Sequence, residues 1–98
     1  MFTIRETLEF ANWLDRLRDQ RAKARIAERV GRLAADNPGD VKSVGDGVNE
    51  LRIDHGPGYR VYFVREGSVV YVLLCGGDKS TQERDIRQAK SLARKLKG

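Results

Sequence analysis

The alternation of apolar and polar positions divides the chain into two helical segments, a strand-rich centre and a terminal helix. Residues 1–5 predict a short strand, and Thr7 is placed to cap the helix that follows. Apolar positions then recur every three or four residues in two successive stretches, as in amphipathic helices. They are Phe10, Trp13, Leu14 and Leu17 in the first stretch and Ala22, Ile26, Val30 and Leu33 in the second. Turn-forming residues at 36–40 end the second helix, so the two stretches predict a helical hairpin.

From residue 48 the apolar period drops to two, which predicts strands at 48–54, 59–66 and 68–76. Glycine-containing turns separate these strands and favour an antiparallel meander. The capping-box sequence Ser80-Thr81-Gln82-Glu83 predicts the start of a C-terminal helix. Its apolar stripe consists of Ile86, Ala89, Leu92 or Ala93, and Leu96. We therefore expect one α+β domain over residues 1–98, with an N-terminal strand and helical hairpin packed on the meander.

The register of the first predicted hairpin places charged residues together on one face of the sheet. If this hairpin is centred on Gly56, Arg52 lies opposite Arg60 and Glu50 lies opposite Tyr62. With a two-residue turn at 67–68, the other face is apolar and carries Leu51, Ile53, Tyr59, Val61, Phe63, Val70, Val72 and Leu74. We expect the helical hairpin to pack on that apolar face and to leave the charged face uncovered.

Charge and cysteine content narrow the function classes. Lys and Arg number 19 against 14 Asp and Glu, and the net charge of +5 favours a polyanionic partner or an acidic protein. The single cysteine, Cys75, has no second thiol for a disulfide or a shared metal site, which is typical of the reducing cytoplasm. No apolar run approaches the roughly 18 residues of a membrane span. We expect a cytoplasmic protein that uses no metal or cofactor and does not bind membranes.

The charged face has a feature that favours anion binding. Two arginines directly opposed on neighbouring strands repel each other unless Glu50 or a bound anion neutralises them. Lys79 follows the last predicted strand near the Arg60 end of the sheet. The glycine pair at 76–77 precedes it and would let the backbone approach a ligand. The alternative is that the arginines pair with Glu50 or Asp78 on a solvated face.

Three segments resemble a known family of bacterial proteins. They are GDVKSVGDGVNELRI at 39–53, GPGYRVYF at 56–63 and LLCGGDKSTQ at 73–82. Together they resemble the addiction module killer (HigB-like) branch of the RelE/ParE toxin superfamily of type II toxin–antitoxin modules, over nearly the whole chain. The resemblance implies a RelE-like fold and a metal-independent mRNA endoribonuclease, free or ribosome-dependent. A ParE-like DNA gyrase inhibitor without nuclease activity is the alternative, and a degenerate interaction module is the third interpretation.

The resemblance also assigns roles to individual residues. The arginine of the family's Gly-Tyr-Arg strand falls on Arg60, the lysine of its second strand on Arg52, and the arginine after its last strand on Lys79. We expect these cations to stabilise the charge that develops on the phosphorus during RNA cleavage. The family's C-terminal tyrosine has no match, since its place falls near Asp85 or Ile86.

Other residues complete the expected site. Glu50 is the natural substitute for the missing proton-transfer group, with Tyr62 as the second choice. Contacts to RNA are expected from Lys42, Tyr62, Lys90 and Arg94. The resemblance implies a cognate antitoxin, a helix-turn-helix protein through which alone the toxin would meet operator DNA, besides mRNA and the ribosome. An acidic face on that antitoxin would suit the net positive charge of this chain.

Overall fold

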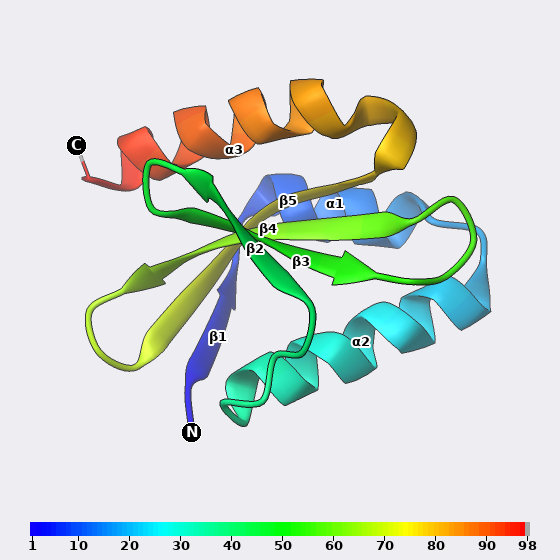
Figure 1. Ribbon diagram of the computed structural model, residues 1–98, viewed down its shortest axis with the longest axis horizontal. Helices are drawn as coiled ribbons and strands as arrows, with labels where there is room; N and C mark the ends of the chain where they lie inside the picture. Colours follow the sequence, from blue (N-terminus) through cyan, green and yellow to red (C-terminus); the bar gives the residue numbers. More distant parts are fainter. Residues whose placement is uncertain (98) are drawn as a thin grey trace.

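A computed structural model describes residues 1–97 and places a five-stranded sheet between helices on both of its faces. The strands are β1 (Thr3–Glu6), β2 (Val41–Gly45), β3 (Val48–Ile53), β4 (Tyr59–Glu66) and β5 (Val70–Asp78). The helices are α1 (Leu8–Arg16), α2 (Gln20–Ala34), the 3₁₀ turn η1 (Lys79–Thr81) and α3 (Gln82–Lys97). The strand order is β1-β5-β4-β3-β2, with β1 parallel to β5 and the other neighbours antiparallel. This arrangement, visible in Figure 1 with α3 above the strands and α2 below them, confirms the predicted α+β, RelE-like fold.

The predicted helical hairpin is present and covers one face of the sheet. Thr7 caps α1 as predicted, because its Oγ accepts a hydrogen bond from Phe10 N at 3.0 Å. The same hydroxyl donates to Leu74 O at 2.6 Å and ties the start of α1 to β5. The predicted stripes pack against Leu51, Val61 and other residues of the central strands. None of the helices within residues 1–97 is long and apolar enough to cross a bilayer.

Asp19 caps α2 and makes the stability of this hairpin depend on pH. Its Oδ1 accepts hydrogen bonds from the backbone N–H groups of Arg21 and Ala22, and His55 Nε2 lies 3.2 Å from its Oδ2. The bond from Ala22, followed by the contact with His55, lowers the pKa of Asp19 below its usual 3.8. Stabilisation by the Asp19 carboxylate is therefore present above about pH 4 and lost as the pH falls through the lowered pKa.

Replacing Asp19 with asparagine should remove this pH dependence while keeping a capping side chain. We expect the melting temperature of the native chain to exceed that of Asp19→Asn at pH 6. The difference should shrink as the pH is lowered from 5 to 2, because the variant side chain does not titrate. Thermal unfolding of both proteins, followed by circular dichroism between pH 6 and pH 2, measures this difference in melting temperature. A difference that stays constant or grows in acid would contradict the assignment.

The sheet register agrees with prediction in one hairpin and differs in the next. Arg52 lies opposite Arg60, and Glu50 opposite Tyr62, as predicted for β3 and β4. In the β4–β5 hairpin, however, Glu66 pairs with Val70, so the turn contains three residues where two were predicted. A slip of one residue moves every side chain of a strand to the other face. The predicted faces of Val70, Val72 and Leu74 are therefore wrong, since all three pack on the side of α3.

Strand β2 was not predicted. The segment 41–45 pairs antiparallel with β3, and the Asp46-Gly47 turn that joins them has positive φ angles of 57° and 78°. This is the backbone conformation that a tight hairpin turn requires. The added strand places Lys42 beside Glu50 and brings Asp40 next to Arg52.

The second face of the sheet is covered by α3, contrary to the expectation that it is free. A second core of buried side chains lies between α3 and the sheet, including Val48, Tyr62, Leu74, Ala89 and Ala93. The predicted capping box is also wrong. Asp78 caps η1 by accepting from Ser80 N at 2.8 Å, and α3 begins two residues later than Ser80. Within residues 1–97, a charged site on this face can therefore lie only at the end of the sheet where α3 begins.

Candidate functional site

Arg60 lies on β4 at the end of the sheet where α3 begins. Its Nη1 donates to Gly58 O at 2.6 Å, which holds the guanidinium against the β3–β4 turn. Its Nε lies 3.9 Å from Glu50 Oε2, too far for a hydrogen bond. The Arg60 side chain is only 12% exposed, so this cation is anchored within the protein rather than free in solvent.

Lys79 meets Arg60 at the same glycine. A Cβ atom placed on Gly58 would lie 2.7 Å from Arg60 Nη1 and 3.7 Å from Lys79 Cβ. Gly58 also has φ +82°, a conformation that other residues adopt with strain. The second glycine of the Gly-Pro-Gly turn therefore makes room for the Arg60 guanidinium, and the Cβ of Lys79 lies beside the same position. Lys79 itself is exposed, and its position directly after β5 is the one that the sequence predicted.

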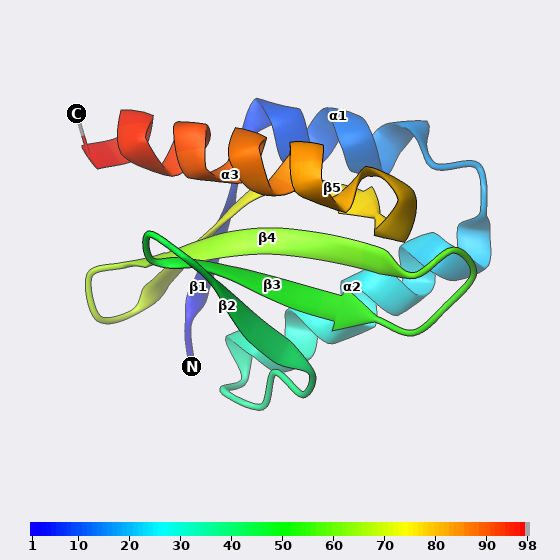
Figure 2. The same cartoon turned by 45° about the horizontal axis from the view of Figure 1, so that its top comes forward.

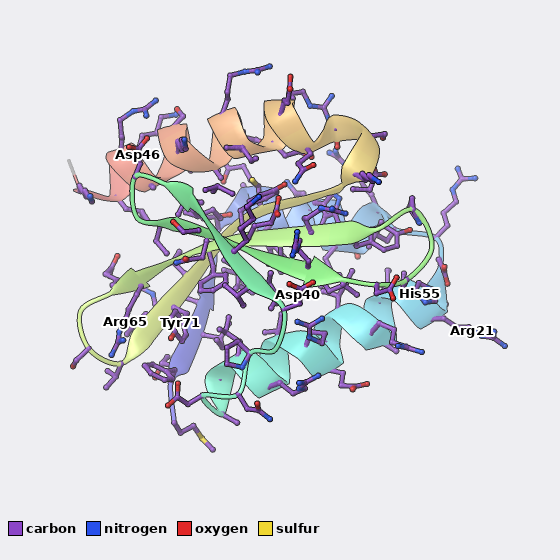
Figure 3. All side chains as sticks on the ribbon, viewed as in Figure 1. Arg21, Asp40, Asp46, His55, Arg65 and Tyr71 are labelled. Carbon is purple, nitrogen blue, oxygen red and sulfur yellow. The ribbon has the colours of Figure 1, made fainter. Side chains whose placement is uncertain are left out.

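Arg52 forms an ion pair with Asp40, which offsets the charge repulsion expected between Arg52 and Arg60. Its Nη2 and Nε lie 3.0 and 3.2 Å from Asp40 Oδ1, and this hydrogen-bonded pair raises the pKa of Arg52. Figure 3 shows Asp40 where the chain enters β2. The Arg52 side chain remains 39% exposed. The two opposed arginines thus have separate carboxylates, Asp40 for Arg52 and Glu50 for Arg60. The sequence predicts a role for Glu50 but none for Asp40.

Arg29 supports this arrangement from α2 and was not singled out in the sequence. Its Nη1 donates to Arg52 O at 2.6 Å and its Nη2 donates to Pro38 O at 2.9 Å. Burial lowers the pKa of Arg29. The side chain therefore joins β3 to the loop that carries Asp40. Helical periodicity could not distinguish it from the other arginines of α2, because its partners are backbone carbonyls distant in sequence.

Glu50 and Tyr62 lie under α3, which corrects the roles expected for them. Both side chains are fully buried. Glu50 Oε2 accepts hydrogen bonds from Tyr62 Oη at 3.0 Å and from Gln82 Nε2 at 2.8 Å. Burial, and next the charge of Glu50, raises the pKa of Tyr62, which keeps the phenol a neutral donor. Neither a general base at Glu50 nor an RNA contact at Tyr62 is compatible with these positions.

The glycine pair of the last strand accommodates the protein's own side chains rather than a ligand. A Cβ atom on Gly76 would overlap the ring of Trp13 from α1. A Cβ atom on Gly77 would overlap the carboxylate of Asp85 from α3, which is bonded to the Thr81 hydroxyl. The strand is thus enclosed from both faces at these two positions. Asp85, near the place of the missing family tyrosine, is buried.

A groove of about 370 Å³ between α1 and α3 reaches Cys75 and Gly76. The two helices pack against opposite faces of β5, at Gly76 and Gly77, and both are seen above the strands in Figure 2. Cys75 is buried, and desolvation raises the pKa of its thiol to about 12. The thiol is therefore protonated at neutral pH and is a core residue, as the sequence indicated.

The remaining basic residues lie at increasing distances from Arg60. Lys42 is exposed on β2, in register with Glu50. Lys90 Nζ lies 3.9 Å from Asp46 Oδ2, at the tip of the β2–β3 turn that Figure 3 shows beside α3. Arg94 is exposed, and it follows Gln82 by twelve residues, or about 18 Å along the helix axis. Lys42 thus adjoins the site, Lys90 lies farther along the sheet, and Arg94 lies outside it.

We refer to Arg52, Arg60 and Lys79 as the cation cluster. It adjoins a polar hollow of about 560 Å³ that is lined by residues 79–84 and Arg87. One cation of the cluster is anchored, one is paired at the surface and one is exposed. Such an arrangement can bind a phosphodiester and stabilise negative charge on it. Among residues 1–97, no group of three or more His, Cys, Asp or Glu side chains is placed to hold a metal ion.

Comparison with known proteins identifies relatives of the whole chain. Residues 12–97 match the family described as "Phage derived protein Gp49-like (DUF891)". An uncharacterized protein of Haemophilus influenzae is 57% identical over 93 residues, which covers 95% of this chain and 94% of the relative. No solved structure matches the chain with statistical significance.

Proposed function

The chain belongs to the phage-derived Gp49-like family, a family of RelE-like, addiction-module toxin-like proteins, and from this membership we propose that it is the toxin of a type II toxin–antitoxin module that cleaves mRNA. The observation that carries the proposal is the meeting of Arg60 and Lys79 at Gly58. Arg52 lies opposite Arg60 on the neighbouring strand and completes a cluster suited to a phosphodiester.

The proposed reaction is metal-independent transesterification of RNA. The 2′-oxygen of a ribose forms a bond to the adjacent phosphorus, and the bond from phosphorus to the 5′-oxygen breaks, leaving a cyclic phosphate. The 2′-hydroxyl loses a proton and the leaving oxygen gains one. The anchored guanidinium of Arg60 would bind the non-bridging oxygens as their charge increases, and Lys79 would approach from the solvent side.

The proton transfers are assigned to groups outside the buried core. Glu50 and Tyr62 are both inaccessible, and Asp85 is buried against Thr81. We therefore propose that the ribosome supplies the proton-transfer groups, which makes ribosome dependence part of the proposal. Lys42, and farther along the sheet Lys90, would contact the RNA strand as it extends away from the scissile phosphate.

The proposed partners and location follow from this role. A cognate antitoxin, proposed to be a helix-turn-helix repressor, would neutralise the toxin in the cytoplasm. Because the chain carries a net charge of +5, an acidic antitoxin surface would bind it most readily. Operator DNA would be reached only through that antitoxin.

A second function is supported by one observation. The position nearest the family's C-terminal tyrosine is occupied by Asp85, which is buried and hydrogen-bonded within the chain. A site without an accessible proton-transfer side chain suits a protein that binds its target without chemistry. Inhibition of DNA gyrase, as in ParE-like toxins, is therefore the alternative.

Expression of the chain without an antitoxin should distinguish these functions. We expect growth arrest and new mRNA 5′ ends, with cleavage reduced about 100-fold in Lys79→Ala because a cation at the reacting phosphate is removed. Arg25→Ala is the matched control, since Arg25 is an exposed cation on α2. Mapping of 5′ ends, beside a gyrase supercoiling assay, measures both activities. Inhibited supercoiling with intact transcripts would rule out the nuclease and support the alternative.

A further inference from the structure

The buried carboxylate of Glu50 lies where β3, β4 and α3 meet. Its Oε2 accepts hydrogen bonds from Tyr62 on β4 and from Gln82, the first residue of α3. Its Oε1 is buried and has no hydrogen-bond partner among the described residues. Arg60 Nε, at 3.9 Å from Oε2, is likewise buried without a hydrogen-bond partner. Glu50 and Arg60 therefore form a buried ion pair in which each partner keeps one polar atom without a hydrogen bond.

Because both groups are buried, the free-energy cost of the charge on Glu50 depends on the presence of Arg60, and the reverse also holds. A fully buried carboxylate is strongly unfavourable unless a cation or several donors compensate it. Tyr62 and Gln82 supply neutral donors, and Arg60 supplies the cation among residues 1–97 that lies within 4 Å of Glu50. The charge of Glu50 in turn attracts the Nε side of the guanidinium, while Gly58 O holds Nη1.

Gln82 connects the same carboxylate to the rest of the site. It follows η1, which begins with Lys79, so its bond to Glu50 fixes the start of α3 against the sheet. A displacement of Gln82 would move the segment that carries Lys79. The positions of Arg60 and Lys79, two of the three cations in the cluster, thus both depend on the buried carboxylate of Glu50.

We propose that Glu50, held by Tyr62 and Gln82, is the positioning group that sets Arg60 and the start of α3 for the reaction. This inference rests on the proposed function. Gln82 has a specific part in it, because it orients the carboxylate without touching the substrate. Neither residue is catalytic in this scheme, because the cation cluster, and not Glu50 or Gln82, would contact the phosphate.

The placement of Arg60 can be tested without any assay of RNA cleavage. In a ¹⁵N-labelled protein, the Nε–Hε signal of Arg60, assigned by its loss in Arg60→Lys, should exchange slowly with water because Nε is buried. Glu50→Gln and Gln82→Ala should each accelerate this exchange at least about tenfold. Gln88→Ala, an exposed glutamine on the same helix, should leave it unchanged. Thermal unfolding verifies that every variant is folded. Unchanged Arg60 exchange in both site variants would overturn the proposal.

Rates of mRNA cleavage distinguish a positioning role of Gln82 from a purely structural one. In a cell-free translation reaction, Gln82→Ala should lower the rate of mRNA cleavage about 10- to 100-fold, as a displaced reacting group does. Binding of a fluorescein-labelled 2′-O-methyl RNA, measured by anisotropy, should change less than about threefold, because every cation of the cluster is retained. Faster Arg60 exchange with normal cleavage would overturn the positioning role. If the native chain neither binds nor cleaves RNA, the proposed function fails, and Arg60 exchange still decides whether Glu50 and Gln82 place Arg60.

Discussion

Gly76→Ala should destabilise the protein by about 3 kcal/mol, a large effect for one added methyl group. The new Cβ would overlap the ring of Trp13, which packs between Phe10 and Tyr59 at centroid distances of 5.8 and 6.2 Å. Because the strand is held by its pairing with β4, the overlap can be relieved only by moving the ring away from its packing on Phe10 and Tyr59. Urea unfolding monitored by tryptophan fluorescence measures the loss through the midpoint concentration.

Gly31→Ala is the matched control for this substitution. Gly31 lies within α2, and a Cβ atom there would have no neighbour within 4 Å. Alanine should stabilise the helix by roughly 0.5–1 kcal/mol, because it restricts the unfolded chain. A Gly76→Ala protein as stable as the native chain but inactive would instead favour the interpretation drawn from sequence, in which the glycine pair admits a ligand. Equal destabilisation by both substitutions would contradict the contact with Trp13.

The sequence predicts the first hairpin correctly because its signals are local. The glycines at 56 and 58 fix the turn, and alternation on both strands then sets which residues oppose each other. The β4–β5 turn fails because a two-residue and a three-residue loop fit the same letters at 67–69. One residue of difference reverses the faces of Val72 and Leu74, and a bulge beside Tyr62 shifts the register again.

The covering of the second face could have been inferred from the helix itself. The apolar stripe of α3, with Ile86, Ala89 and Ala93, needs a surface to pack on, and the first face is already occupied by the hairpin. The stripe is visible in the sequence, but no local signal identifies the surface on which it packs. The lack of such a signal led to the expectation that Glu50 and Tyr62 face solvent.

The sequence predicts the three cations of the cluster but only one of their two carboxylate partners. Glu50 lies two residues before Arg52, the partner of Arg60, so the predicted register already brings it near Arg60. Asp40 belongs to the loop that enters β2, a strand that was not predicted, so its pairing with Arg52 had no local signal. Gln82 also reaches Glu50 from 32 residues away in the chain. Such contacts depend on the tertiary fold and not on any periodicity.

Arg60→Ala should destabilise the chain by about 3 kcal/mol even in the absence of RNA, because it leaves Glu50 as a buried charge without a cation. This loss of stability is at the lower end of the range for broken buried ion pairs, since Arg60 Nε lies 3.9 Å from Glu50 Oε2 and makes no hydrogen bond to it.

The double variant Arg60→Ala, Glu50→Gln provides the decisive comparison for this pair. A neutral amide keeps an oxygen that can accept from Tyr62 or Gln82 but removes the buried charge, so we expect the double variant to be more stable than Arg60→Ala alone. Arg52→Ala is the surface control and should cost much less, because its pair with Asp40 is exposed and screened by water. Urea unfolding of the native chain, Arg60→Ala, Glu50→Gln and the double variant gives the coupling energy between Arg60 and Glu50. Strictly additive effects would mean that the two charges do not interact, and Glu50 could then not be the group that positions Arg60.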